Sequence, residues 1–127
     1  MSAADRRTAR RVRRILAVRF PGVIIARNSR RPKVPLKLGI ARDILRRCPD
    51  LDVRSVAMAL VHYMGGPGYL GVLIEGARRC NLDGDTAGMV TAGQARRATE
   101  RLARIHAHNL RQEESARQQR PDANPAP

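Results

Sequence analysis

The chain has 127 residues, a length that fits one domain with flanking tails, and 43% of them are hydrophobic. With two Tyr, one Phe and no Trp, an aromatic-rich core is excluded and the core must be mainly aliphatic. The net charge is +14 at pH 7, and residues 1–37 alone carry +11 of it. This concentration of positive charge predicts a polyanionic partner, nucleic acid first and an anionic membrane second, without distinguishing DNA from RNA.

The two cysteines, Cys48 and Cys80, form neither a disulfide framework nor a Cys-x-x-Cys motif. A reduced, cytoplasmic setting is the simpler interpretation. The sequence has no apolar run of membrane-spanning length, and its basic N-terminus lacks the apolar segment of a signal peptide. We therefore expect a soluble cytoplasmic protein without a membrane partner.

Residues 5–19 are predicted to form the first helix, because apolar residues recur there at helical spacing: Val12, Ile15 and Leu16. Six arginines lie on its other faces: Arg6, Arg7, Arg10, Arg11, Arg13 and Arg14. Very few acids are available to pair with them, so a phosphate-contacting face is favoured over an ordinary solvated face. A membrane-surface helix is the alternative, although the apolar face is narrow and has no aromatic residue.

Residues 23–26 form a short run typical of a β-strand, and residues 28–34 form a basic loop. The loop carries Arg30, Arg31 and Lys33. A second helix is predicted after Gly39, to about Arg47, and Pro49 stops it.

A third helix is predicted over residues 53–64, with Asp52 as its N-cap. Its expected buried face consists of Val56, Ala59, Leu60 and Tyr63. The second and third helices are close enough in sequence to resemble a helix-turn-helix. The third helix, however, offers few polar groups that could read base edges in duplex DNA.

Residues 64–84 carry the most specific pattern of the chain. A helix is expected to end at Gly65 and a new one to begin at Pro67, with Tyr69 in its first turn. Free N–H groups at such a start bind phosphates, and those of Gly66 and Gly68 are candidates. With Arg78 and Arg79 close behind, the pattern suggests a phosphate-and-base pocket. A core tyrosine beside a solvated strand face explains the same residues equally well.

The rest of the chain is predicted as a hairpin followed by one long helix. Strands are expected at residues 78–82 and 87–90, joined by a turn at Asp83-Gly84 that is longer than two residues. Thr91 and Gln94 have the spacing of a capping box for a helix that runs to about residue 116. Residues 118–127 are expected to be a disordered tail.

No catalytic set is apparent, so we do not expect an enzyme, and we expect no cofactor and no metal. The three histidines are His62, His106 and His108, and none of them forms an i, i+4 metal-ligand pair. Phosphate-loop and nucleophile-elbow motifs are both missing. A nuclease is the remaining enzymatic alternative.

Two stretches resemble the ProQ/FinO domain of bacterial RNA chaperones: PLKLGIARDIL, and LVHYMGGPGYLGVLIEGARRCNLDGDTAGMV. The resemblance begins near residue 16, runs to about residue 105, and keeps the motifs in order and at matching spacing. It implies a mostly α fold with a small β component (α+β). The implied domains are a basic helical arm (residues 1–14), a ProQ/FinO-like domain (15–110) and a polar helix end with a disordered tail (111–127).

The resemblance also implies a function. Family members bind stem-loops with single-stranded 3′ ends, such as terminators, stabilise small regulatory RNAs and help them pair with messenger RNAs. The 3′ end enters a pocket whose lysine, tyrosine and arginine match Lys37, Tyr69 and Arg79. Tyr69 would stack on an unpaired base or bind its sugar or phosphate, and the two cations would hold phosphates. The chain would act as a monomer, without a small-molecule substrate.

Two departures from the family pattern concern the RNA stem. Positions that are often basic in the third helix are here Val53, Ala57 and Val61, which leaves Arg54 as its only basic residue. Hydroxyl side chains that often cap the next helix are missing. We therefore expect the N-terminal arginines, including Arg10, Arg13 and Arg14, and the basic loop to supply these contacts. A double-stranded DNA-binding protein or a ribosome-associated structural protein remains the alternative.

Overall fold

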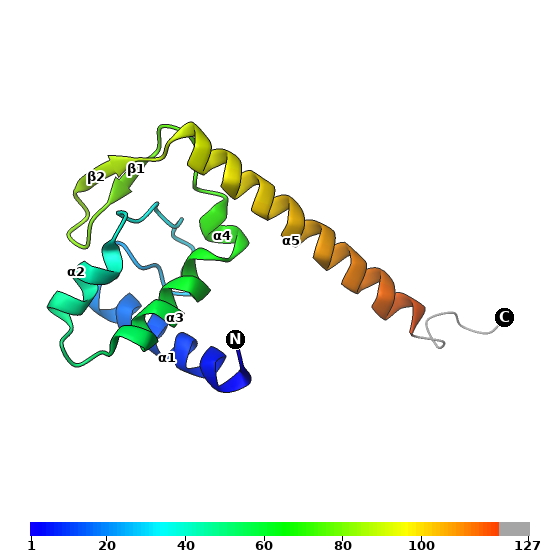
Figure 1. Cartoon of the computed structure of the whole chain (residues 1–127), viewed down its shortest axis with the longest axis horizontal. Coiled ribbons are helices and arrows are strands. Elements are labelled where there is room, and N and C mark those ends of the chain that lie inside the picture. The colour runs from blue at the N-terminus through cyan, green and yellow to red at the C-terminus, as the bar shows by residue number, and fades with distance from the viewer. Residues whose placement is uncertain (120–127) are drawn as a thin grey trace.

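The computed structural model describes residues 1–119 and is mostly helical, with one small hairpin (Figure 1). In chain order, its elements are α1 (Ala3–Arg19), α2 (Ile40–Arg47), α3 (Val53–Met64), α4 (Pro67–Leu70), β1 (Arg78–Cys80), β2 (Thr86–Met89) and α5 (Ala92–Gln118). The predicted α+β class, with a hairpin and a long C-terminal helix, is confirmed.

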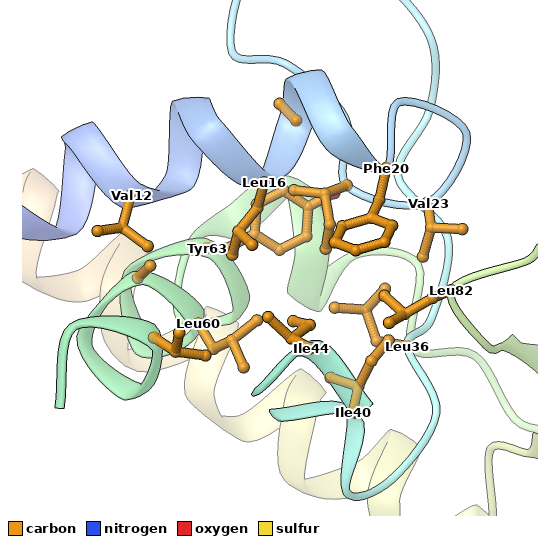
Figure 2. Close-up of a cluster of buried hydrophobic side chains, with 14 of the residues drawn as sticks. Val12, Leu16, Phe20, Val23, Leu36, Ile40, Ile44, Leu60, Tyr63 and Leu82 are labelled. Atoms are coloured by element: carbon orange, nitrogen blue, oxygen red, sulfur yellow. The ribbon is translucent and has the colours of Figure 1, made fainter. Parts of the chain in front are cut away.

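The core forms where α1 packs against α3, with α2 closing it from the side (Figure 2). Leu16 from α1, Ile44 from α2 and Tyr63 from α3 are each at most 1% exposed. The four residues predicted for the buried face of α3 are all buried: Val56, Ala59, Leu60 and Tyr63. Most of these core side chains are aliphatic, as the scarcity of aromatic residues requires.

The helix starts follow the capping signals in the sequence. The Asp52 side chain accepts a hydrogen bond from the Ser55 N–H at the start of α3, and Thr91 and Gln94 form the expected capping box of α5. Ser2 and Asp5 form a second capping box, which begins α1 two residues before the predicted start. Gly39 precedes α2 with φ of +80°, a conformation that an L side chain rarely adopts.

The hairpin is extended on one side by an irregular segment of the chain. β1 and β2 are antiparallel, with an irregularity in register between Arg78 and Cys80. On the other side of β1, the Lys37 N–H donates to the Cys80 carbonyl at 2.9 Å, and the Cys80 N–H donates to the Pro35 carbonyl at 2.9 Å. Residues 35–37, here called the 35–37 segment, therefore lie beside β1 like a short third strand.

Residues 23–26 do not form a strand, so that prediction is wrong. They make a turn that follows α1, in which the Ile24 N–H donates to the Phe20 carbonyl. Val23, Ile24 and Ile25 are all at most 3% exposed, so side chains on both sides of the segment are buried. A short apolar run fits such an enclosed turn as well as a strand, and periodicity cannot separate the two.

The two ends of the chain differ in packing. α1 is one continuous helix whose Ala9 and Val12 are buried, so the expected boundary between residues 14 and 15 falls inside it. α5 starts against α4 and then extends away from the other elements (Figure 1). It continues through Gln118, and the rest of the predicted tail, residues 120–127, lies outside the described residues. None of the described helices is long and apolar enough to cross a membrane.

Candidate nucleic-acid interface

Tyr69 and Arg79 both bind the 35–37 segment. The Leu36 N–H donates to the Tyr69 hydroxyl oxygen at 3.0 Å, and Arg79 Nη1 donates to the Leu36 carbonyl at 2.8 Å. Arg79 Nη2 also donates to Gln94 Oε1 at 3.0 Å, which connects β1 to the start of α5. The two side chains are 3% and 5% exposed, so they fix the 35–37 segment from inside the fold.

The buried position of Tyr69 prevents its ring from stacking on an unpaired base. Its ring lies against the Tyr63 ring, with centroids 5.8 Å apart, and neither face is open for an unpaired base to stack on. The hydroxyl hydrogen is not used by the Leu36 bond, because the oxygen is the acceptor there. Arg79 Nε is buried and has no hydrogen-bond partner among residues 1–119.

Lys37 lies in the same segment, but its side chain reaches a different partner. Its Nζ atom is 2.7 Å from Asp43 Oδ2, and the side chain is 40% exposed. The hydrogen bond from Lys37 lowers the pKa of the Asp43 carboxyl below its ordinary value. The structure therefore joins Lys37, Tyr69 and Arg79 through the 35–37 backbone rather than through one shared side-chain contact.

Four other residues that the sequence predicts to contact RNA lie at the surface. Arg78 Nη1 donates to Thr86 Oγ1 across the hairpin at 3.0 Å. Arg30 and Arg31 are exposed in the loop that precedes the 35–37 segment. Arg54 is 3.4 Å from Asp5 and is 77% exposed, so it connects α3 loosely to the start of α1.

Two cations lie over one buried aromatic ring. Arg13 Cζ is 4.9 Å from the Tyr63 ring centroid, and Lys33 Nζ is 5.1 Å from it. Burial lowers the pKa of Arg13 and of Lys33, and the charge of Arg13 lowers the pKa of Lys33 further. Lys33 also lies beside α4, since a Cβ atom on Gly68 would be 3.1 Å from its Nζ. Gly66 is the N-cap of α4 and has no side chain to offer.

His62 lies beside these two cations. Its Nδ1 atom is 3.2 Å from Arg13 Nη1. Because a guanidinium only donates, Nδ1 must accept, and the proton of the neutral ring is on Nε2. Burial lowers the pKa of His62, and so do the surrounding charges of Arg13, Arg10, Arg27 and Lys33. His62 is therefore a neutral ring among cations at pH 7.

A groove with a volume of about 970 Å³ lies along α1. Five α1 arginines line it: Arg7, Arg10, Arg11, Arg13 and Arg14. The rest of the lining is Ala17 and Val18 of α1, Ala26, Arg27 and Asn28 of the following turn, and His62 of α3. We call this the arginine groove. None of the four ion pairs within residues 1–119 uses one of its six arginines.

The sequence predicts a phosphate-contacting arginine face on α1. The structure brings Arg10, Arg13 and Arg14 of this face together with Arg7 and Arg11 in the arginine groove. Arg27, Asn28 and His62 were missed, because their positions depend on how the turn after α1 and helix α3 pack beside it. The only local signal was the basic character of Arg27. On α3 itself, Val53 and Val61 are 69% and 57% exposed, so its outward face is apolar.

Residues 1–119 contain no group of three or more His, Cys, Asp or Glu side chains that could hold a metal ion. A second, smaller hollow beside Lys37 is lined by paired charges, since Arg47 lies 2.6 Å from Asp83 there. Of these two hollows, the arginine groove therefore has the more uncompensated charge.

The sequence and the fold match known proteins. The model of the ProQ/FINO family matches residues 6–117. The RNA chaperone ProQ of Idiomarina loihiensis is 36% identical over 90 residues, a match that covers 68% of this chain and 42% of that protein. The chain thus spans less than half the length of this curated relative.

Two solved structures share the fold. A ProQ homolog from Legionella pneumophila has a TM-score of 0.62 and 26% identity, with 77% of this chain and 83% of that chain covered. A FinO-like RNA chaperone from Neisseria meningitidis MC58 has a TM-score of 0.59 and 22% identity, with 73% and 92% covered.

Proposed function

The chain belongs to the ProQ/FinO family, and we propose that it is an RNA-binding chaperone for structured RNAs. The observation that carries this proposal is the arginine groove, where six arginines lie without an acidic partner from residues 1–119. Phosphates are the natural partners of such a surface, because each bound phosphate neutralises a cation and releases a counterion. Its matched relative from Idiomarina loihiensis carries the name RNA chaperone.

We propose that the single-stranded 3′ end of the RNA binds beside the 35–37 segment. The half-exposed amine of Lys37 would hold a phosphate in exchange for Asp43. Tyr69 and Arg79 would act mainly by holding the segment in place, since both bind Leu36. The Nζ atom of Lys37 is the exposed donor that a 3′-terminal phosphate would reach, because Arg79 Nε and the Tyr69 hydroxyl are buried.

Small regulatory RNAs and messenger RNA 3′ ends are the proposed partners, bound by a cytoplasmic monomer without catalysis. The helix-turn-helix alternative is not favoured by α3. Three of its exposed residues, Val53, Ala57 and Val61, offer no hydrogen bonds to base edges, and Arg54 is its only arginine or lysine. An excess of duplex DNA should therefore compete poorly with an RNA hairpin. Since we propose no catalysis, labelled RNA should also stay intact in the presence of Mg²⁺.

The test is a gel-shift titration of one terminator-type hairpin with and without its 3′-oligouridine tail. We expect the tailed form to bind about tenfold more tightly or better, since each stacked or held nucleotide contributes about 1–3 kcal/mol. Lys37→Ala should remove most of this preference. Its matched control is Arg42→Ala, at an exposed position of α2, which should retain it. Equal binding of both hairpins would contradict the 3′-end proposal, and binding of neither would contradict RNA binding altogether.

A further inference from the structure

Part of the lining of the arginine groove is apolar. Ala17, Val18 and Ala26 line it together with the arginines, and Val18 is 80% exposed although it is a valine. A surface that only binds phosphates needs cations and no such apolar lining. An RNA duplex would present its phosphates and sugars to α1 and leave Val18 without a partner.

An unpaired nucleotide matches both parts of the groove. Its base is flat and largely apolar, and it would lie against the apolar lining residues Ala17, Val18 and Ala26. Guanidinium planes stack on such bases and also bind the adjoining phosphates. Asn28 and the Nε2–H of His62 also line the groove and would meet the polar edge of a base. A volume of about 970 Å³ is at the upper end of the range for ligand pockets.

We propose that the arginine groove is a second RNA site, which binds unpaired nucleotides by their bases and phosphates. The proposal rests on the RNA-binding function above. No residue that lines the arginine groove belongs to the 35–37 segment or its partners Tyr69 and Arg79. One chain would therefore hold a 3′ end and a separate single-stranded segment at the same time. Holding two unpaired segments together is what an annealing protein requires.

The experiment uses fluorescence anisotropy with a short oligouridine whose 3′ end is blocked by a phosphate, so that the 3′-end site is disfavoured. A matched abasic oligomer has the same backbone charge and no bases. For the wild-type protein we expect the abasic oligomer to bind at least about fivefold more weakly, because one stacked base accounts for about 5- to 150-fold in affinity. Equal affinities would overturn the proposal in favour of a simple phosphate surface.

Two matched variants locate the effect. Val18→Glu places a carboxylate in the lining of the arginine groove, and Val53→Glu places one at an exposed valine of α3 outside it. Both change the net charge equally, and neither removes a buried side chain. We expect Val18→Glu to weaken oligouridine binding about tenfold or more, a loss comparable to one stacked base. Val53→Glu should change it only slightly.

Equal losses for Val18→Glu and Val53→Glu would overturn the proposal, and so would a wild-type protein that binds the tailed hairpin but no blocked oligouridine. The tailed hairpin separates this failure from failure of the proposed function. If the wild-type protein binds the hairpin with its 3′-end preference while these tests fail, only the second site is refuted. If the hairpin itself does not bind, the RNA-binding function is refuted, and the second site with it.

Discussion

Tyr69 and Arg79 hold the two polar groups of one residue: Tyr69 accepts from the Leu36 N–H and Arg79 donates to the Leu36 carbonyl. Two side chains that the family resemblance assigns to RNA thus also hold a backbone segment beside β1. Substitution of each side chain separates the two roles.

Tyr69→Phe should destabilise the fold. It leaves the buried Leu36 N–H without an acceptor, which costs about 1–3 kcal/mol in the free energy of unfolding. Urea denaturation followed by circular dichroism measures this loss. The free energy of RNA binding should change less than the free energy of unfolding does. Unchanged stability together with lost RNA binding would mean that the hydroxyl acts directly on the RNA. Tyr69→Ala is a poorer test, because it would also empty part of the core.

Arg79→Lys should also lower the free energy of unfolding, by about 1–3 kcal/mol. The forked guanidinium bonds both the Leu36 carbonyl and Gln94 Oε1, and a single ammonium on a flexible four-carbon stem does not reproduce that geometry. The matched control is Arg78→Lys on the same strand, which is exposed and should change stability by less than about 0.5 kcal/mol. Equal stability of the two variants would show that the buried fork is not needed.

Arg10→Ala and Arg14→Ala should weaken RNA binding and reduce its dependence on salt. The logarithm of the affinity falls as the logarithm of the salt concentration rises. Each lost phosphate contact should make this slope shallower by about 1. Arg42→Ala on α2, also exposed, should leave the slope unchanged. These substitutions are preferable to removal of residues 1–14, which would strip the buried Ala9 and Val12 from the core. An unchanged slope in both groove variants would mean that RNA does not occupy the arginine groove.

Acid should destabilise the protein through His62. Its pKa in the fold is below the ordinary 6.5, because of burial and of Arg13, Arg10, Arg27 and Lys33. The unfolded chain then binds the proton more readily, so stability is greatest above pH 6.5 and is lost as the pH falls below it. The lowered pKa values of Asp5, Asp43, Asp50, Asp52 and Asp83 act in another range, since their stabilisation is lost only below about pH 3.8.

The melting temperature, compared at about pH 7.5 and about pH 5.5, isolates the histidine contribution. His62→Gln should reduce the loss between these two conditions. His106→Gln, at an exposed position of α5, should keep it. The same loss in both variants would assign the acid sensitivity to another group.

Local signals in the sequence predicted the helices well. Asp52 and the spacing of Val56, Ala59, Leu60 and Tyr63 placed α3 with the bounds that the structure has. Thr91 and Gln94 did the same for the start of α5. These signals act within one or two turns of chain, so a single sequence carries them.

Tertiary packing accounts for what could not be predicted. The pattern around Tyr69 fitted a surface pocket and a core position equally, and only its contact with Leu36 and Tyr63 decides for the core. Likewise, His62 lines the arginine groove only because α3 lies against α1, and Arg27 only because the turn after α1 folds back beside it. Such neighbours are far apart in sequence and leave no periodic trace in it.

The C-terminal half of α5 should unfold locally, without the rest of the fold. Every residue from His106 to Gln119 is exposed, and none of the other described elements covers this part of the helix. A lone stretch of about a dozen helical residues is only marginally stable in water. Its amide hydrogens should therefore exchange with solvent through local fraying. Those of α1 and α3 should exchange only through global unfolding. A protease that cuts after Arg111 or Arg117 would shorten this helix, and the core would stay folded.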